Sequence, residues 1–232
     1  MDMLDELTEE TARVQQLALD ADLGAAIAAC PGWTAYDLVA HLGAIHRWAA
    51  RATRTPPDGL VPDLEEPHGL TGSALAGWYA TSAAELAEAL SVDADRPCWT
   101  LAAPGTVRFW RRRQLHETVV HRWDLETALG RSARIHAAVA LDGIDEVLTA
   151  MLPRQVRLRR VEESSRWVRL RVDGQDRALA SSAAHDPQPV ATVGGDASSI
   201  LLLLWARLGL DALSVDGDRH ALEEFLAGAL TP

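Results

Sequence analysis

Apolar residues recur every three or four positions along four stretches in the first part of the chain, which is the spacing of one buried helix face. These stretches are residues 3–29, 34–52, 73–90 and 109–129. Acidic residues crowd the first turn of the first stretch, where the helix dipole favours them, and Gly130 follows the last stretch as a common helix stop. Four long helices in succession predict an antiparallel four-helix bundle over residues 1–135.

The start of the second predicted helix carries a capping signal. Thr34 is followed three residues later by Asp37, which is the spacing of a capping box with Asp in place of the usual Glu. Pro31 and Gly32 lie just before it, and both residues interrupt helices. We therefore expect the first helix to end before Pro31 and the second to begin at Thr34.

After Gly130 the pattern changes to a mixture of strands and helices. Trp167–Val172 alternates with the period of two that marks a half-buried strand, and a predicted turn follows at Asp173 and Gly174. Asp196 is the expected N-cap of a very apolar helix. The remaining elements are expected as strands at 190–193 and 213–215 and as helices at 137–151, 197–208 and 218–229. The predicted fold class is α+β, with the bundle followed by a smaller C-terminal α/β domain over residues 136–232.

Composition narrows the function classes. The chain has 232 residues, 48% of them hydrophobic, and a formal net charge of −11. That charge argues against nucleic-acid binding and against binding to anionic membranes, because both need clustered positive charge. The longest apolar stretch, residues 200–210, is interrupted by Arg207 and is too short to span a bilayer. With two cysteines and no signal-peptide pattern at the start, we expect a soluble cytoplasmic protein.

The chemistry is concentrated in the fourth predicted helix. Glu117 and His121 are four residues apart, so a helix places both side chains on one face. Arg113 and Asp124 fall in the same polar stripe at 100° per residue. Such a stripe usually faces water, where these residues would form surface ion pairs. The alternative is that Glu117 and His121 are two ligands of a divalent metal.

His41 favours the metal interpretation. It lies in the middle of the second predicted helix among apolar residues, either as a hydrogen-bonded core histidine or as a third ligand supplied across the bundle. Two imidazoles and a carboxylate leave coordination positions open, as in catalytic zinc sites or non-haem iron sites. His46 lies about 140° round the helix from His41, which makes it a poor co-ligand.

The neighbouring polar residues have two interpretations each. Asp124 is a candidate to orient His121 from behind the metal, or it pairs with a nearby arginine. Arg113, or Arg111 and Arg112 beside it, is a candidate to bind a substrate carboxylate, although arginines on a helix are more often solvated.

The segments that carry these residues resemble the mycothiol-dependent maleylpyruvate isomerase family, one of the DinB-like four-helix-bundle metalloenzymes. The resemblance covers nearly the whole chain and rests on Cys30–Gly43, His116–Asp124, Ala128–Gly130, Val193–Arg207 and Val215–Arg219. It implies a divalent metal, normally zinc, held by His41, Glu117 and His121, and an arginine in the C-terminal domain that contacts substrate and matches Arg207. It also implies mycothiol, the low-molecular-weight thiol of actinobacteria, as cosubstrate. The Arg-only basic residues and absence of Asn suit such a GC-rich source.

From this resemblance we expect an enzyme that activates mycothiol as a metal-bound thiolate. The thiolate adds to a small electrophilic substrate, and the product either stays conjugated, as in an S-transferase, or expels the thiol after a bond rotation, as in an isomerase. Two other hypotheses stay open. One is a thiol-independent hydrolase that uses metal-bound water, and the other is a non-catalytic module that binds a small molecule in the bundle.

Overall fold

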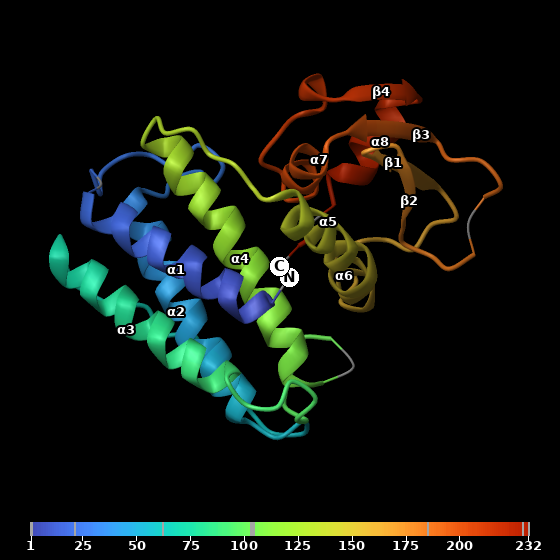
Figure 1. Cartoon of the computed structure of the whole chain (residues 1–232). Helices are drawn as coiled ribbons and strands as arrows, with labels where there is room; N and C mark the ends of the chain where they lie inside the picture. The colour runs from blue at the N-terminus through green and yellow to red at the C-terminus, as the bar shows by residue number, and fades with distance from the viewer. Residues whose placement is uncertain are drawn as a thin grey trace. The chain divides into compact units, whose positions relative to one another are not determined.

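The computed structural model describes residues 2–20, 22–61, 63–102, 105–184, 186–228 and 230–231. The chain divides into two compact units, Met1–Arg134 and Ile135–Pro232 (Figure 1). The first unit is helical, and the second combines helices with a small mixed sheet. This confirms the predicted α+β fold class.

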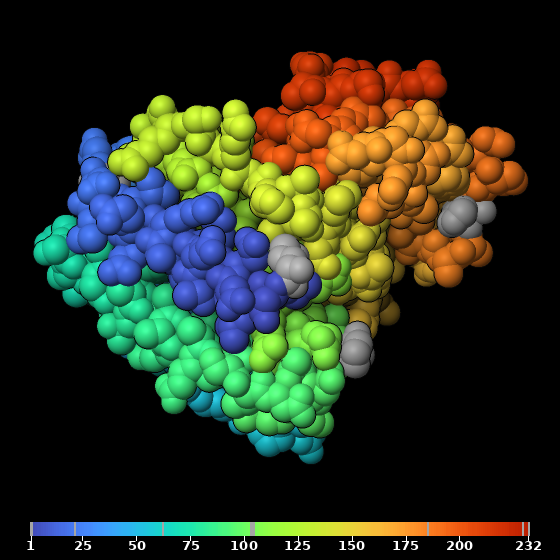
Figure 2. All heavy atoms as spheres, in the orientation of Figure 1, coloured from blue at the N-terminus to red at the C-terminus, as the bar shows by residue number. Residues whose placement is uncertain are grey.

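The first unit is built from four long helices: α1 Met3–Asp20, α2 Ala35–Arg54, α3 Ser73–Leu90 and α4 Val107–Ala128. Helix α1 packs against α3 and α4, and α2 also packs against both of them. Figure 2 shows α1 and α3 side by side on the surface of this unit. The apolar faces that the periodicity predicted meet in one core, which includes Val14, Leu38, Leu42, Leu75 and Leu125.

Two local features fix helix α2. The predicted capping box is present: the Thr34 side chain accepts from the backbone N–H of Asp37, and Asp37 Oδ2 accepts from Thr34 N at 2.8 Å. On the face toward α3, a Cβ at Gly43 would lie 2.3 Å from Cζ3 of Trp78. Only a glycine lets the indole approach this closely, so α2 lies tightly against α3.

The first helix ends earlier than predicted, at Asp20. Residues 22–34 instead form turns, in which Ala26 and Thr34 make an isolated bridge. Leu23 and Ala25 still pack on the core, and their carbonyls accept hydrogen bonds from the first turn of α2. The apolar positions therefore continue the helical pattern although the backbone has left the helix.

The second unit begins with helices. Helix α5 spans Ala137–Glu146, a π-helical turn spans Val147–Met151, and α6 spans Leu152–Arg157. The predicted helix over 137–151 therefore continues to Arg157. Pro153 does not end it: it lies in the first turn of α6, directly after the π-helical turn, and the backbone stays helical through it.

A four-stranded sheet follows, in the order β2-β1-β3-β4. Its strands are β1 Trp167–Val172, β2 Gln175–Ala180, β3 Ala191–Gly195 and β4 Ser214–Gly217. β1 pairs antiparallel with β2 and parallel with β3, and β3 pairs antiparallel with β4. Strand β2 was not predicted, because it is an edge strand whose first half, Gln175–Arg177, is polar.

Helix α7, Ala197–Leu204, starts as predicted at Asp196, whose carboxylate accepts from Ser199 N at 2.9 Å. It ends four residues before the predicted boundary, because Ala206 takes a left-handed φ of 58°. A short 3-10 turn, Leu210–Ala212, and helix α8, Arg219–Leu226, complete the unit. Within the described residues, no helix is long and apolar enough to cross a membrane.

Candidate metal centre

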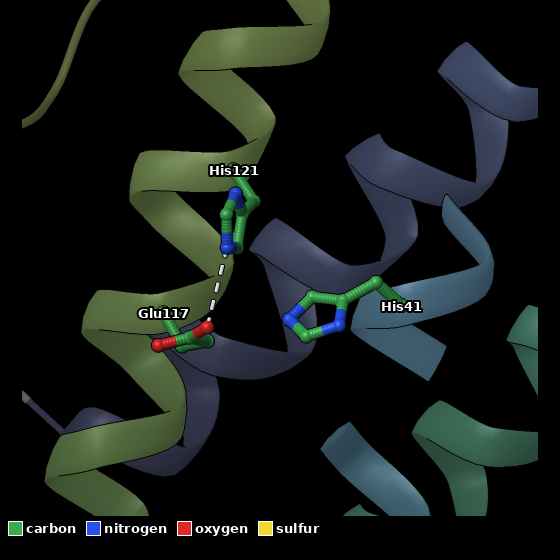
Figure 3. A group of neighbouring side chains, drawn as sticks. All are labelled: His41, Glu117 and His121. Atoms are coloured by element: carbon green, nitrogen blue, oxygen red, sulfur yellow. Dashed lines mark hydrogen bonds and ion pairs between the residues drawn. The ribbon is translucent and has the colours of Figure 1, made fainter. Parts of the chain in front are cut away.

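Three side chains from two helices converge in the first unit (Figure 3). Helix α4 supplies Glu117 and His121, and α2 supplies His41. One ligand atom from each residue lies within 4.8 Å of the other two. The side chains are largely removed from water, with 21% of His41, 13% of Glu117 and 7% of His121 exposed. These are the three residues that the sequence proposed as ligands.

His121 is held at both ring nitrogens. Its Nδ1 lies 3.1 Å from Oδ2 of the buried Asp124, and its Nε2 lies 3.2 Å from Oε1 of Glu117. The contact with Asp124 fixes the orientation of the ring and directs Nε2 toward Glu117 and His41. Carboxylates take this position behind metal-bound histidines because they hold the distal N–H and keep the other nitrogen available.

Glu117 and His41 are also supported from outside the group. The Arg113 guanidinium, which is buried, donates to Oε2 of Glu117 and leaves Oε1 facing His121. His41 Nδ1 lies 3.3 Å from Oε1 of Glu66, and the Trp33 ring lies edge-on to the imidazole with centroids 4.8 Å apart. Glu66 was missed by the sequence analysis, because it lies in a loop without periodicity, 25 positions from its partner.

The pKa values reflect these contacts. Burial by itself raises the pKa of Glu117, but Arg113 and the hydrogen bond with His121 act against burial, so that the net shift is strongly downward. Burial lowers the pKa of His121, yet hydrogen bonds to Asp124 and Glu117 bring it to about 9. Burial is the main cause that lowers the pKa of His41. At neutral pH and without a metal, these shifts leave Glu117 ionised, His41 neutral and His121 protonated between two carboxylates.

The donor set fits a divalent cation. Two ligands at about 2.1 Å from a tetrahedral zinc ion lie roughly 3.4 Å apart, and the Glu117 Oε1 to His121 Nε2 separation is 3.2 Å. In Figure 3 one ring nitrogen of His41 points toward the other two residues. With one carboxylate and two imidazoles as ligands, such an ion would keep a position open for a small molecule.

Burial excludes the alternative in which the polar stripe of the fourth helix faces water. Arg113, Asp124 and His121 are all buried. Arg111, a second candidate for carboxylate binding, instead donates to the backbone carbonyls of Leu90 and Val92. The substrate-binding role expected of Arg113 stays a prediction, and the structure adds its contact with Glu117.

Arg207, the candidate catalytic arginine, belongs to the second unit. It follows α7 and is half-buried, with its Nη1 donating to the Trp205 carbonyl at 2.7 Å and its Cζ 5.8 Å from the centre of the Trp205 ring. Its catalytic role stays a prediction.

Comparison with known proteins matches both units. The family model described as the mycothiol maleylpyruvate isomerase N-terminal domain matches residues 4–126, and the model of the MDMPI C-terminal domain matches residues 138–224. Two solved structures are similar: a mycothiol-dependent maleylpyruvate isomerase, 17% identical, and a histidine-to-alanine mutant, 16% identical. Each alignment covers 93% of this chain and 92% of the other, with a TM-score of 0.67. No curated protein matches the sequence.

Proposed function

We propose that this chain, which belongs to the mycothiol maleylpyruvate isomerase family, is a metal-dependent enzyme that isomerises a small electrophile with mycothiol as cosubstrate. The observation that carries the proposal is the convergence of His41, Glu117 and His121 within 4.8 Å. The names of the family model and of the two similar structures support mycothiol as the thiol and maleylpyruvate as the first substrate to test.

In this proposal the protein contributes the three ligands of the cation and the residues that orient them. When bound, a divalent cation such as Zn²⁺ lowers the pKa of a coordinated thiol, so that the thiol ionises at neutral pH. His41, Glu117 and His121 would hold that cation, and three ligands leave a coordination position available for mycothiol. Asp124 would keep His121 in the tautomer that presents Nε2, and Arg113 would keep Glu117 ionised and oriented.

The isomerisation needs no other covalent partner. The thiolate sulfur adds to one carbon of a cis double bond that is conjugated to a carbonyl. The electron pair of the double bond moves to the carbonyl oxygen until the thiolate leaves, and the bond between the two carbons becomes single. Rotation about this bond and loss of the same thiol give the trans isomer and return the cosubstrate. Arg113 in the first unit and Arg207 in the second remain separate candidates for a contact with a carboxylate of such a substrate.

Metal analysis and turnover test the proposal. We expect about one zinc per chain in purified protein, and isomerisation of maleylpyruvate only when mycothiol is added. A His121→Ala variant should lose both. A protein without bound metal, or a His121→Ala variant that retains it, would contradict the metal site. Turnover without thiol would favour the hydrolase, and a stable thiol adduct as the end product would favour the S-transferase.

A further inference from the structure

A buried histidine outside the ligand group joins the two helices that carry it. His46 on α2 has no exposed surface, and its Nε2 lies 3.1 Å from Oγ1 of Thr118 on α4. Thr118 is the neighbour of Glu117 in sequence, and His46 lies five positions after His41. Glu117 and His121 also act electrostatically on His46. The hydrogen bond therefore connects α2 to α4 at the level of the ligand group.

The direction of this hydrogen bond follows from the partners of Thr118. Its hydroxyl donates to the carbonyl of Gln114 at 2.7 Å, and a hydroxyl has one proton to donate. The hydroxyl oxygen must then accept from Nε2–H of His46. Burial lowers the pKa of His46 to about 3, so the ring is neutral, carries its proton on Nε2 and has a bare Nδ1.

Packing alone does not explain a histidine at this position. Nδ1 is buried and has no hydrogen-bond partner among the described residues. An unpaired buried acceptor destabilises a fold, whereas a leucine of similar size would leave no such atom. The hydrogen bond to Thr118 is the contribution that an apolar side chain would not make.

We propose that His46 is a positioning residue of the metal centre. Its hydrogen bond to Thr118 fixes the position of α2 along α4 and therefore the distance from His41 to Glu117 and His121. A helix advances about 1.5 Å per residue, whereas metal–ligand distances must hold to about 0.2 Å. A slide of α2 by a fraction of one residue thus removes His41 from the metal. The inference rests on the proposed function, because it concerns the same three ligands.

The test compares variants that break or keep this hydrogen bond in the full-length chain. His46→Leu and Thr118→Val remove it, and His46→Gln and Thr118→Ser keep a donor and an acceptor in place. Zn²⁺ affinity is measured by competition with a chelator, and coordination by the visible absorption of bound Co²⁺. We expect roughly tenfold weaker binding and an altered Co²⁺ spectrum for the two breaking variants, the size of one lost buried hydrogen bond. The two conservative variants should bind as wild type does.

The controls separate positioning from general loss of packing. Tyr79→Phe removes a buried hydroxyl on α3 next to His46, where the ring centroids are 5.5 Å apart, and should leave metal affinity unchanged. The double variant His46→Leu/Thr118→Val should bind no more weakly than either single variant. Thr118→Val is nearly isosteric, so it tests the inference even if His46→Leu does not fold.

The outcomes distinguish this inference from the proposed function. Wild-type protein that binds metal, with Thr118→Val showing the same affinity and the same Co²⁺ spectrum, would overturn the positioning role and leave the metal site intact. Wild-type protein that binds no metal would overturn the proposed function and the positioning role together.

Discussion

Helix α4 carries two buried polar clusters that look alike in sequence and differ in what they do. The ligand cluster contains His41, Glu117 and His121. The arginine cluster contains Glu10, Arg122 and Glu126. Both include a pair of residues at i,i+4 spacing on α4, Glu117 with His121 and Arg122 with Glu126, and both reach across to a residue on another helix.

The arginine cluster is complete without any ligand. Nε of Arg122 donates to Glu10, Nη1 donates to Glu126, and Nη2 donates to the Arg134 carbonyl at 2.6 Å. The second oxygen of Glu10 accepts from Arg13 at 3.0 Å. All three guanidinium nitrogens of Arg122 have acceptors, so this cluster joins α1 to α4 through contacts within the protein.

In the ligand cluster, Arg113 donates to Glu117 and His121 bridges two carboxylates, yet ligand atoms of three residues also converge. The carboxylates of Glu66, Glu117 and Asp124 surround two imidazoles, and three potential ligand atoms point at one another. A polar pair on a helix therefore does not identify a site by its spacing. The convergence of ligand atoms does: each guanidinium nitrogen of Arg122 meets its own acceptor, whereas in the ligand cluster one atom from each of three residues lies within 4.8 Å of the other two.

Removing the arginine should have the largest effect on stability. Arg122→Met leaves the buried Glu10 with Arg13 alone and the partly buried Glu126 without the guanidinium, and breaking a buried ion pair costs about 3–5 kcal/mol. Urea unfolding should show this decrease, while the amount of metal bound per folded chain stays as in wild type. The double variant Glu10→Met/Arg122→Met should recover part of the loss. A decrease of less than about 1 kcal/mol would mean that the cluster is not structural.

The same substitution at one glutamate of each cluster compares their effects on metal binding. Glu117→Gln removes a charged ligand and should weaken Zn²⁺ binding by more than about a hundredfold, beyond the range seen for partners of ligands. Glu126→Gln makes the same chemical change in the arginine cluster and should leave Zn²⁺ affinity unchanged. Isothermal titration of both variants measures the difference. Equal affinities in the two variants would show that Glu117 is not a ligand.

A substitution at Asp124 tests whether its contact with His121 contributes to Zn²⁺ affinity. Asp124→Asn keeps the shape of the side chain but removes the charge that holds Nδ1 of His121. We expect Zn²⁺ affinity to fall about 10–100-fold, as for other residues behind metal-bound histidines. Competition with a chelator measures the change. An unchanged affinity would place Asp124 with the purely structural residues of α4.

The ligand cluster could be predicted because each of its residues is recognisable within its own helix. The i,i+4 spacing of Glu117 and His121 sets their common face, and His41 stands out in an apolar helix. Burial of the polar stripe was not predictable, because α4 is buried on several sides and its periodicity does not show which face meets water. The contact of Arg122 with Glu10 was not predictable either, because the two residues lie 112 positions apart.

The same limit applied elsewhere in the fold. Strand β2 was missed because its pairing with β1 is set by a turn and an edge position and not by its own alternation. Residues 22–34 kept a helical spacing of apolar positions while the backbone turned back toward α2. In both cases, contacts formed by the folded chain outweighed the local pattern.

Proton release has the most gradual effect, because it changes Zn²⁺ affinity only step by step with pH, and it reports on the proton that His121 holds between Asp124 and Glu117. In the metal-free protein His121 has a pKa raised to about 9 by its carboxylate partners, whereas Glu117 is ionised and the pKa of His41 lies below its usual value. Between about pH 6.5 and 9 the metal must therefore displace one proton, from His121. Zn²⁺ affinity should rise about tenfold per pH unit in this window and level off above it. Titration calorimetry in buffers of different ionisation enthalpy counts the protons released. An affinity that does not change with pH would mean that His121 is already neutral in the metal-free protein. Its contacts with Asp124 and Glu117 would then not hold a proton that the metal displaces.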